Sequence, residues 1–211
     1  MAISFPRSDI LTLVGFEPPF TFEPVSQQEQ SRLSIGTTIG KDLGPALWFA
    51  SYTTEELHND VMVEYQAVLA SLDGIINSFE AWDLRRPAPR LYPGGTGAND
   101  GVLASVNANN KALALSGLAA GQTISRGDYL SFDYDGGRAL HQAMETVTAN
   151  GSGVTAQFEV RPHLRAGWAL SSAVNLKAPR CLFVLLPDSV VPTQTRGKFG
   201  RLSFKTVQAL V

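Results

Sequence analysis

The stretch NDVMVEYQAVLASLD, residues 59–73, is the segment whose helical pattern organises the rest of the chain. Its apolar residues recur at spacings of three and four, which places them on one face of a helix: Val61, Tyr65, Val68, Leu69 and Leu72. Asn59 or Asp60 can cap the first turn, and Gly74 suits a left-handed stop after the last. Because only one face is apolar, we expect this helix to pack against a sheet.

The segments on both sides of this helix show strand patterns instead. Residues 20–25, 31–36 and 46–52 before it, 75–82 after it, and 202–207 near the chain end fit strands. Pro18-Pro19 excludes a helix where it stands, and the run Gly40–Pro45 should interrupt a strand. Residues 181–186 are wholly apolar, as is typical of a strand buried on both faces.

The middle of the chain has a different amino-acid composition. Residues 83–93 are rich in Pro and Arg and should be extended, whereas the Gly-rich residues 94–101 are typical of a flexible linker. Short strands and turn signals such as Asp135-Gly136-Gly137 follow, which favours a small barrel or sandwich. The predicted fold is therefore mainly β. A β-sandwich with one packed helix comprises residues 1–95 and 181–211, and a small β-barrel or β-sandwich domain, residues 96–180, is inserted.

The composition limits the partners of the chain. Charged residues make up 17% of the 211 residues and hydrophobic residues 44%, whereas a typical soluble domain carries about 25% charged residues. Some of the surface should therefore face a protein partner rather than water. The net charge of -2 shows no basic excess, so we expect no nucleic-acid binding. The N-terminus lacks a signal-peptide pattern and no apolar run suggests a membrane span.

No motif for catalysis or metal binding stands out. Cys181 is the only cysteine and lies in an apolar run, so we expect it to be buried. The three histidines His58, His141 and His163 are far apart and fit no metal-binding pattern. Asp133–Gly137 is not followed by the glutamate of an EF-hand loop. We therefore predict a protein that is not an enzyme and has no cofactor and no metal site.

The most unusual local feature is Arg85-Arg86-Pro87-Ala88-Pro89-Arg90. Arg pairs with carboxylates and stacks on aromatic rings, and it is enriched at protein interfaces. For this segment we favour a role at a protein interface or as a brace between domains over a solvated loop or a nucleic-acid contact.

Several segments resemble tail proteins of long-tailed bacteriophages. These are Leu69–Gly74 followed by Phe79–Asp83 and Arg85-Arg86-Pro87, then Leu115–Phe132 with its Gly121, Gly127-Asp128 spacing, and Val160–Arg165. The resemblance covers roughly residues 45–186. Among these tail proteins, the chain is most similar to the distal tail protein. It implies a β-sandwich ring domain with a helix and a second β domain outside the ring.

This resemblance implies a structural subunit of the virion tail, assembled in the host cytoplasm. The subunit would form a homo-oligomeric ring, six-fold in symmetry, at the distal end of the tail tube, where it would connect the tube to the tail tip or baseplate. Its partners would be further copies of itself, the tail tube protein, the tail hub or tip protein and the tape measure protein. The interface candidates are aromatic and Arg anchors: Trp48, Trp82, Arg85, Arg86 and Arg90.

The sequence is also compatible with other functions. The middle domain could bind a host-surface carbohydrate, which would require exposed aromatic side chains such as Trp168. The chain could also be another tail-tube or head–tail connector component. A cell-wall hydrolase is a third alternative, but no catalytic triad, metal cluster or spaced acid pair supports it.

Overall fold

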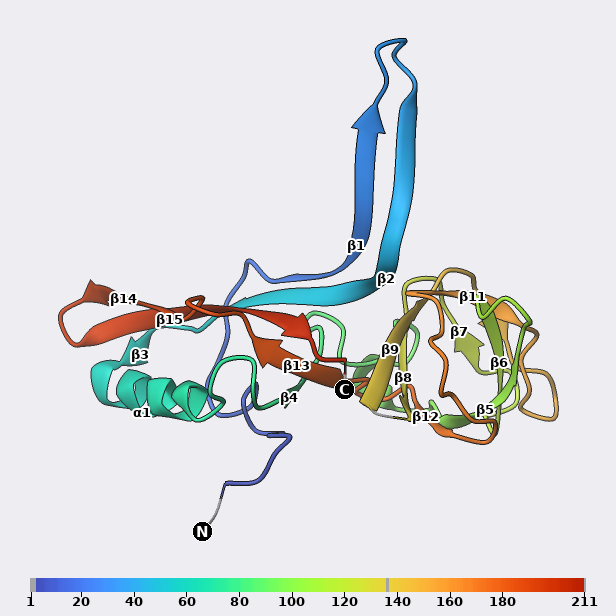
Figure 1. Cartoon of the computed structure of the whole chain (residues 1–211). Helices are drawn as coiled ribbons and strands as arrows, with labels where there is room; N and C mark the ends of the chain where they lie inside the picture. The colour runs from blue at the N-terminus through green and yellow to red at the C-terminus, as the bar shows by residue number, and fades with distance from the viewer. Residues whose placement is uncertain (1–2, 136, 211) are drawn as a thin grey trace.

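The computed structural model describes residues 3–135 and 137–210, so Met1, Ala2, Gly136 and Val211 lie outside the described residues. The chain is mainly β, with one α-helix, an open sheet and a closed barrel, as predicted (Figure 1). Seven strands form the open sheet: β1 (Thr21–Arg32), β2 (Thr38–Thr53), β3 (Leu57–His58), β4 (Phe79–Ala81), β13 (Cys181–Leu185), β14 (Val191–Arg196) and β15 (Phe199–Gln208).

Strand β15 is the centre of this sheet. On one side it pairs with β2 and then β3, and on the other with β13 and β14, all antiparallel. Strand β1 extends the sheet beyond β2, and β4 extends it beyond β13. The two ends of the chain thus build one sheet, with the barrel inserted between β4 and β13.

Helix α1 (Asn59–Ala70) confirms the predicted helix and packs its apolar face on this sheet. Tyr65 and Leu69 are buried, and Leu72 just beyond the helix is buried with them. The N-cap is His58 rather than Asn59 or Asp60: its Nδ1 accepts a hydrogen bond from the Asp60 amide at 3.5 Å. After the helix, Gly74 adopts the left-handed φ of 64° that was expected of it.

The sheet and the helix enclose an aromatic core, and Trp48, Tyr52, Phe79, Phe183 and Phe204 are almost completely buried in it. Cys181 lies in the same core without exposure, as predicted, and burial raises the pKa of its thiol well above the usual value.

The middle of the chain forms a closed six-stranded barrel in the order β11-β6-β5-β12-β8-β9. Its strands are β5 (Gly101–Val106), β6 (Ala112–Ser116), β8 (Tyr129–Tyr134), β9 (Gly137–Ala143), β11 (Phe158–Arg161) and β12 (Ala173–Asn175). The short strands β7 (Thr123–Ile124) and β10 (Val147–Thr148) pair with each other. A separate apolar core that includes Leu113, Phe132 and Phe158 fills this part of the molecule. Strands β8 and β9 pair antiparallel up to Tyr134 and Gly137, whereas Gly136, in the middle of the predicted turn, lies outside the described residues.

The Gly-rich segment between sheet and barrel is not the flexible linker that its composition suggests. It contains a short 3₁₀ turn, η1 (Pro93–Gly95), and Gln122 hydrogen-bonds both the amide and the carbonyl of Asn99. Asp100 accepts hydrogen bonds from the amides of Leu176 and Lys177. Here the glycines adopt left-handed backbone angles that close ordered turns, instead of making the segment flexible.

Three further expectations about strands are wrong. The predicted strand over residues 31–36 ends at Arg32, because residues 33–37 join β1 to β2. The predicted strand over residues 75–82 is reduced to β4, because residues 71–76 form turns after the helix. The run Gly40–Pro45, expected to interrupt a strand, lies inside the 16-residue strand β2. As a result, the chain has one long hairpin where the sequence pattern suggested separate short strands.

Candidate assembly interface

Strands β1 and β2 form a long arm that projects away from the rest of the molecule (Figure 1). Strand β15 pairs with β2 only from Phe49 to Thr53, so the part of β2 before Phe49 pairs with β1 alone. In β1, every residue after Phe22 is exposed, and in β2 every residue from Thr38 to Leu43 is exposed. We call residues 23–46 the arm.

The arm leaves the sheet where its pairing is irregular. Register shifts occur between Val25 and Gln27 and between Gln27 and Gln28, opposite Gly44 and Pro45 in β2. Such bulges bend the strand that carries them, and Figure 1 shows β2 turning away from the sheet to enter the arm. The residues that looked like a strand break in the sequence therefore mark a bend within one strand.

A two-stranded hairpin that is exposed on both faces is at best marginally stable in water. The outer edge of β1 pairs with no strand in the described part of the chain, so its backbone donors and acceptors can bind another chain. The arm also exposes large apolar side chains, namely Val25, Leu33, Ile35, Ile39 and Leu43. An unpaired strand edge with exposed apolar side chains is typical of a surface that binds another chain.

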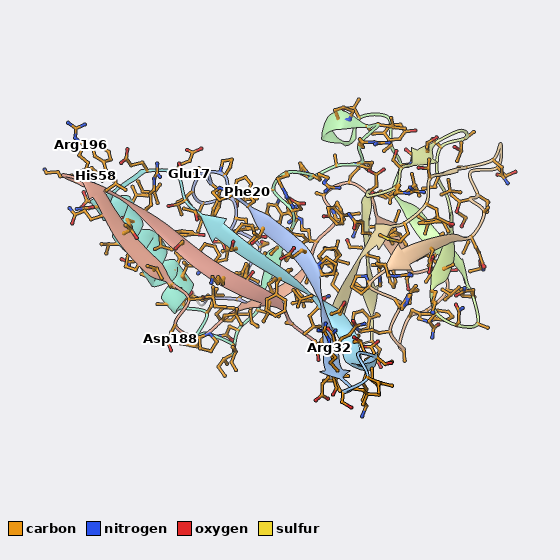
Figure 2. The ribbon with its side chains drawn as sticks, turned by 90° about the horizontal axis from the view of Figure 1, so that it is seen from above. Glu17, Phe20, Arg32, His58, Asp188 and Arg196 are labelled. Carbon is orange, nitrogen blue, oxygen red and sulfur yellow. The ribbon has the colours of Figure 1, made fainter. Side chains whose placement is uncertain are left out.

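A second open edge lies elsewhere on the same sheet. Strand β14 pairs only with β15, and all its residues are exposed. Figure 2, which looks along the arm, places Arg196 of β14 at the other end of the sheet from Arg32 near the arm tip. The sheet thus offers two strand edges, β1 and β14, that lie far apart on one molecule.

The predicted anchor Trp48 lies inside the molecule rather than on an open surface. It has no exposed area, its ring stacks on Phe22 at 5.2 Å, and it meets the edge of Tyr129 at 5.6 Å. Its Nε1–H donates a hydrogen bond of 2.7 Å to the carbonyl of Leu140 in the barrel. Trp48 therefore joins the base of the arm, the sheet and the barrel within one chain, and cannot anchor a neighbouring copy as expected.

The other predicted anchors also lie where the sheet meets the barrel, a region that we call the junction. Trp82 is buried and carries the Arg180 guanidinium over its ring at 4.8 Å. Arg85 pairs with the buried carboxylate of Asp83, which also accepts a hydrogen bond from the Tyr129 hydroxyl at 3.2 Å. The brace between domains, weighed above for the Arg-rich segment, describes these contacts better than an intermolecular interface.

The remaining two arginines contact the barrel, Arg86 through its side chain and Arg90 through its backbone. Arg86 lies over the ring of Tyr129 and donates to the carbonyl of Gly127, and the backbone amide of Arg90 donates to Asp128. Asp128 also accepts from the amide of Ser125, which closes the Gly127-Asp128 turn. This turn, which carries part of the resemblance to tail proteins, is therefore where the Arg-rich segment contacts the barrel.

Glu80 in β4 completes the junction by pairing with two arginines. One carboxylate oxygen lies 2.8 Å from Arg138 of barrel strand β9, and the other lies 2.9 Å from Arg180 just before β13. All three side chains are mostly shielded from water, with exposed fractions of 16%, 27% and 35% for Glu80, Arg138 and Arg180.

We expect Glu80→Gln to lower the free energy of unfolding by about 1–3 kcal/mol, because two half-buried guanidinium groups lose their shared carboxylate. Urea denaturation followed by tryptophan fluorescence measures the loss. Glu159→Gln is the matched control, since Glu159 pairs with Arg161 on an exposed surface where ion pairs contribute little. An equal effect of the two substitutions would show that the Glu80 cluster does not brace the domains.

His141 in strand β9 is a buried histidine opposite Leu130 of the barrel core. Its ring stacks on Phe132 at 5.3 Å, and its Nδ1–H donates to the carbonyl of Pro162 at 2.6 Å. Its Nε2 has no hydrogen-bond partner within the described part of the chain. Burial, helped by the nearby charges of Arg165 and His163, lowers the pKa of His141 to about 4.

This depressed pKa makes the fold sensitive to acid. The unfolded chain binds a proton at His141 below its ordinary value of 6.5, whereas the folded chain resists protonation down to about 4. The stability from neutral His141 is therefore fully present above pH 6.5 and is lost as the pH falls from 6.5 to 4, by roughly 3 kcal/mol in total. We expect His141→Phe, which keeps the stack on Phe132, to lose less stability over this pH range than the wild type does. Thermal unfolding at a series of pH values tests this, and parallel pH profiles would contradict it.

Three further observations concern the carbohydrate, metal and membrane expectations. Trp168, the aromatic that a carbohydrate-binding barrel would expose, is half-buried against the barrel core and donates to Asn110. In residues 3–135 and 137–210, no cluster of three or more His, Cys, Asp or Glu side chains could hold a metal ion. None of the helical residues described forms a segment long and apolar enough to cross a membrane.

Compared with known proteins, the chain matches no family model, and no curated protein sequence is significantly similar to it.

Proposed function

We propose that this protein is a structural subunit that assembles with copies of itself into a closed ring in the tail of a bacteriophage. The observation that carries the proposal is the arm, a two-stranded hairpin exposed on both faces and unpaired along the outer edge of β1. In the described part of the chain nothing covers it, and a hairpin of this kind needs a partner for stability.

The positions of the two open edges favour a ring. An interface that joins the β1 edge of one copy to the β14 edge of the next uses two different surfaces, so it is head-to-tail. Such an interface closes into a ring when the rotation between copies divides a full turn. Backbone hydrogen bonds between the edges would continue the sheet from one copy to the next, as in strand addition.

The assignment to a phage tail rests on the sequence resemblance, and the site geometry is compatible with it. The ring would lie at the distal end of the tail tube, with six copies around the axis, and would connect the tube to the tip or baseplate. Its neighbours would be the tail tube protein, the hub or tip protein and the tape measure protein. In this role the barrel is a second domain braced against the ring sheet by Trp48, Glu80 and the Arg-rich segment.

Sedimentation velocity of the purified full-length chain over a concentration series tests self-assembly. The subunit mass is 22.7 kDa, so a six-membered ring has a mass of about 136 kDa. We expect species at this mass, or at whole multiples of it, to replace the monomer as the concentration rises. Few species of intermediate mass are expected, because a ring gains its last contact on closure. A monomer at every concentration would contradict self-assembly of this chain.

A further inference from the structure

The tip of the arm is an uncharged, apolar end with a fixed backbone. Residues Leu33–Thr37 join the two strands, and Ile35 at the turn is 82% exposed. The Leu33 amide donates to Thr37 at 2.8 Å, and the Gly36 amide donates back to Leu33 at 2.9 Å. Gly36 has the left-handed φ of 86° that this turn requires. The tip is therefore ordered before it meets a partner, which lowers the entropy cost of binding.

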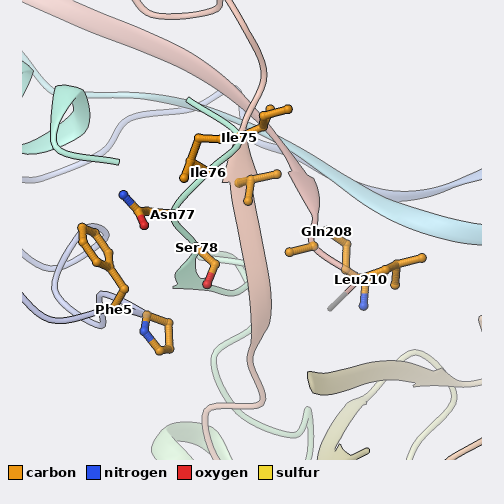
Figure 3. A pocket seen from close by; sticks show the side chains of 10 residues that line it. Phe5, Ile75, Ile76, Asn77, Ser78, Gln208 and Leu210 are labelled. Atoms are coloured by element: carbon orange, nitrogen blue, oxygen red, sulfur yellow. The ribbon is translucent and has the colours of Figure 1, made fainter. Parts of the chain in front are cut away.

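An apolar groove lies between the two ends of the chain, and Figure 3 shows it from close by. Phe5 lies on one side of it, Ile75 and Ile76 lie above, and Leu210 lies on the far side. The groove has a volume of about 520 Å³, within the range of roughly 300–1,000 Å³ of sites that bind ligands. None of the residues that line it carries a charged side chain: Phe5, Pro6, Ile75, Ile76, Asn77, Ser78, Val184, Gln208, Ala209 and Leu210.

The tip and the groove are chemically matched but cannot meet in one molecule. Of the large hydrophobic side chains in residues 3–135 and 137–210, Ile35 at the tip and Ile76 at the groove are the most exposed, at 82% and 74%. The arm rises from one side of the sheet, and the segment that carries Phe5 lies on the other side (Figure 1). An arm that points away from the groove of its own chain reaches the groove of another copy instead.

We infer that the arm tip of one copy inserts Ile35 into the groove of a second copy, against Ile76. Each copy carries one tip and one groove, so the contact repeats without a different protein. The charges beside the two surfaces are also opposite. Arg32 precedes the tip and forms no ion pair with any described residue, whereas the exposed Asp73 accepts a hydrogen bond from the groove residue Asn77.

This inference deepens the proposed function and rests on it. Because the tip and the groove lie on opposite sides of the sheet, successive contacts stack copies along the direction of the arm. The contact is head-to-tail and differs from the edge-to-edge contact that would close a ring. The arm would thus serve two partners, one along its strand edge and one at its tip.

Cysteine cross-linking in the full-length protein tests the contact. Ile35→Cys and Ile76→Cys are made as separate variants, mixed, and oxidised at a concentration at which the wild type is associated. The native Cys181 is buried and its thiol pKa is raised, so it does not compete. The control mixture pairs Ile35→Cys with Val63→Cys, since Val63 is 60% exposed on helix α1 outside the groove.

We expect a band at twice the 22.7 kDa subunit mass from the Ile35→Cys and Ile76→Cys mixture, at least tenfold stronger than from either variant alone or from the control. Associated protein that gives no such band overturns the tip contact but leaves self-assembly standing. Protein that stays monomeric in sedimentation overturns both. Equal bands from the test and control mixtures show random collision and also overturn the contact.

Discussion

Shortening the arm is expected to convert the assembled protein into a folded monomer. The variant replaces residues 26–46 by Asn-Gly, which joins the directly paired residues Val25 and Leu47 through a two-residue turn of the kind that closes hairpins. The core residues Phe22 and Trp48 and the pairing of β2 with β15 are retained. The fold should therefore survive while the exposed edge and tip are lost.

Sedimentation velocity gives the mass of the shortened variant, and thermal unfolding shows whether its melting temperature stays close to that of the wild-type monomer. Leu170→Ser is the control, since it removes an exposed apolar side chain of the barrel, distant from the arm in sequence, and should leave assembly unchanged. A shortened protein that forms the same oligomer as the wild type would show that the arm is not the assembly element.

The second large effect is expected from Trp48→Ala, which should lower the free energy of unfolding by about 3–5 kcal/mol. The substitution leaves a cavity between Phe22 and Tyr129 and removes the donor to the Leu140 carbonyl. Because this one side chain touches the arm base, the sheet and the barrel, its loss should loosen all three. Urea denaturation followed by circular dichroism measures the change.

A conservative variant separates the two contributions of Trp48. Trp48→Phe keeps an aromatic ring against Phe22 but leaves the Leu140 carbonyl without its donor, so we expect a loss of about 1–3 kcal/mol. Trp168→Ala is the control, because that indole is only half-buried. If Trp48→Ala costs no more than Trp168→Ala, Trp48 does not hold the domains together.

The parts of the fold that follow a local pattern could be predicted from the sequence. Helix α1 has an apolar face with helical spacing, Cys181 lies in a wholly apolar strand, and the antiparallel pair β8–β9 follows a glycine-containing hairpin signal. In each case the physical cause lies within a few residues, so neighbouring sequence is sufficient to identify it.

The arm could not be predicted this way, because its residues are exposed and pack on no core within the described part of the chain. Gln27–Gln30 is a polar run without apolar alternation, and Gly40, Gly44 and Pro45 are residues that usually end a strand. A strand exposed on both faces has no core to impose a period of two on its sequence. The one available signal was the low charge of the chain as a whole, which indicated a partner but not where it binds.

The position of the predicted anchors between sheet and barrel could not be predicted for a related reason. The sequence shows that Trp48 and Trp82 are large aromatics and that Arg85, Arg86 and Arg90 cluster, but not which surface they face. The inserted barrel creates an internal interface with the same composition as an interface between proteins. Aromatic and Arg anchors were therefore expected at an interface, and in the structure this interface lies within one chain.

Negative-stain electron microscopy of the purified full-length protein at high concentration, with class averaging, tests directly whether the chain forms a ring. We expect closed rings with a central hole wide enough for a tail tube, and the class averages give the number of copies. Isolated monomers in every class, at concentrations where the arm should be paired, would contradict it.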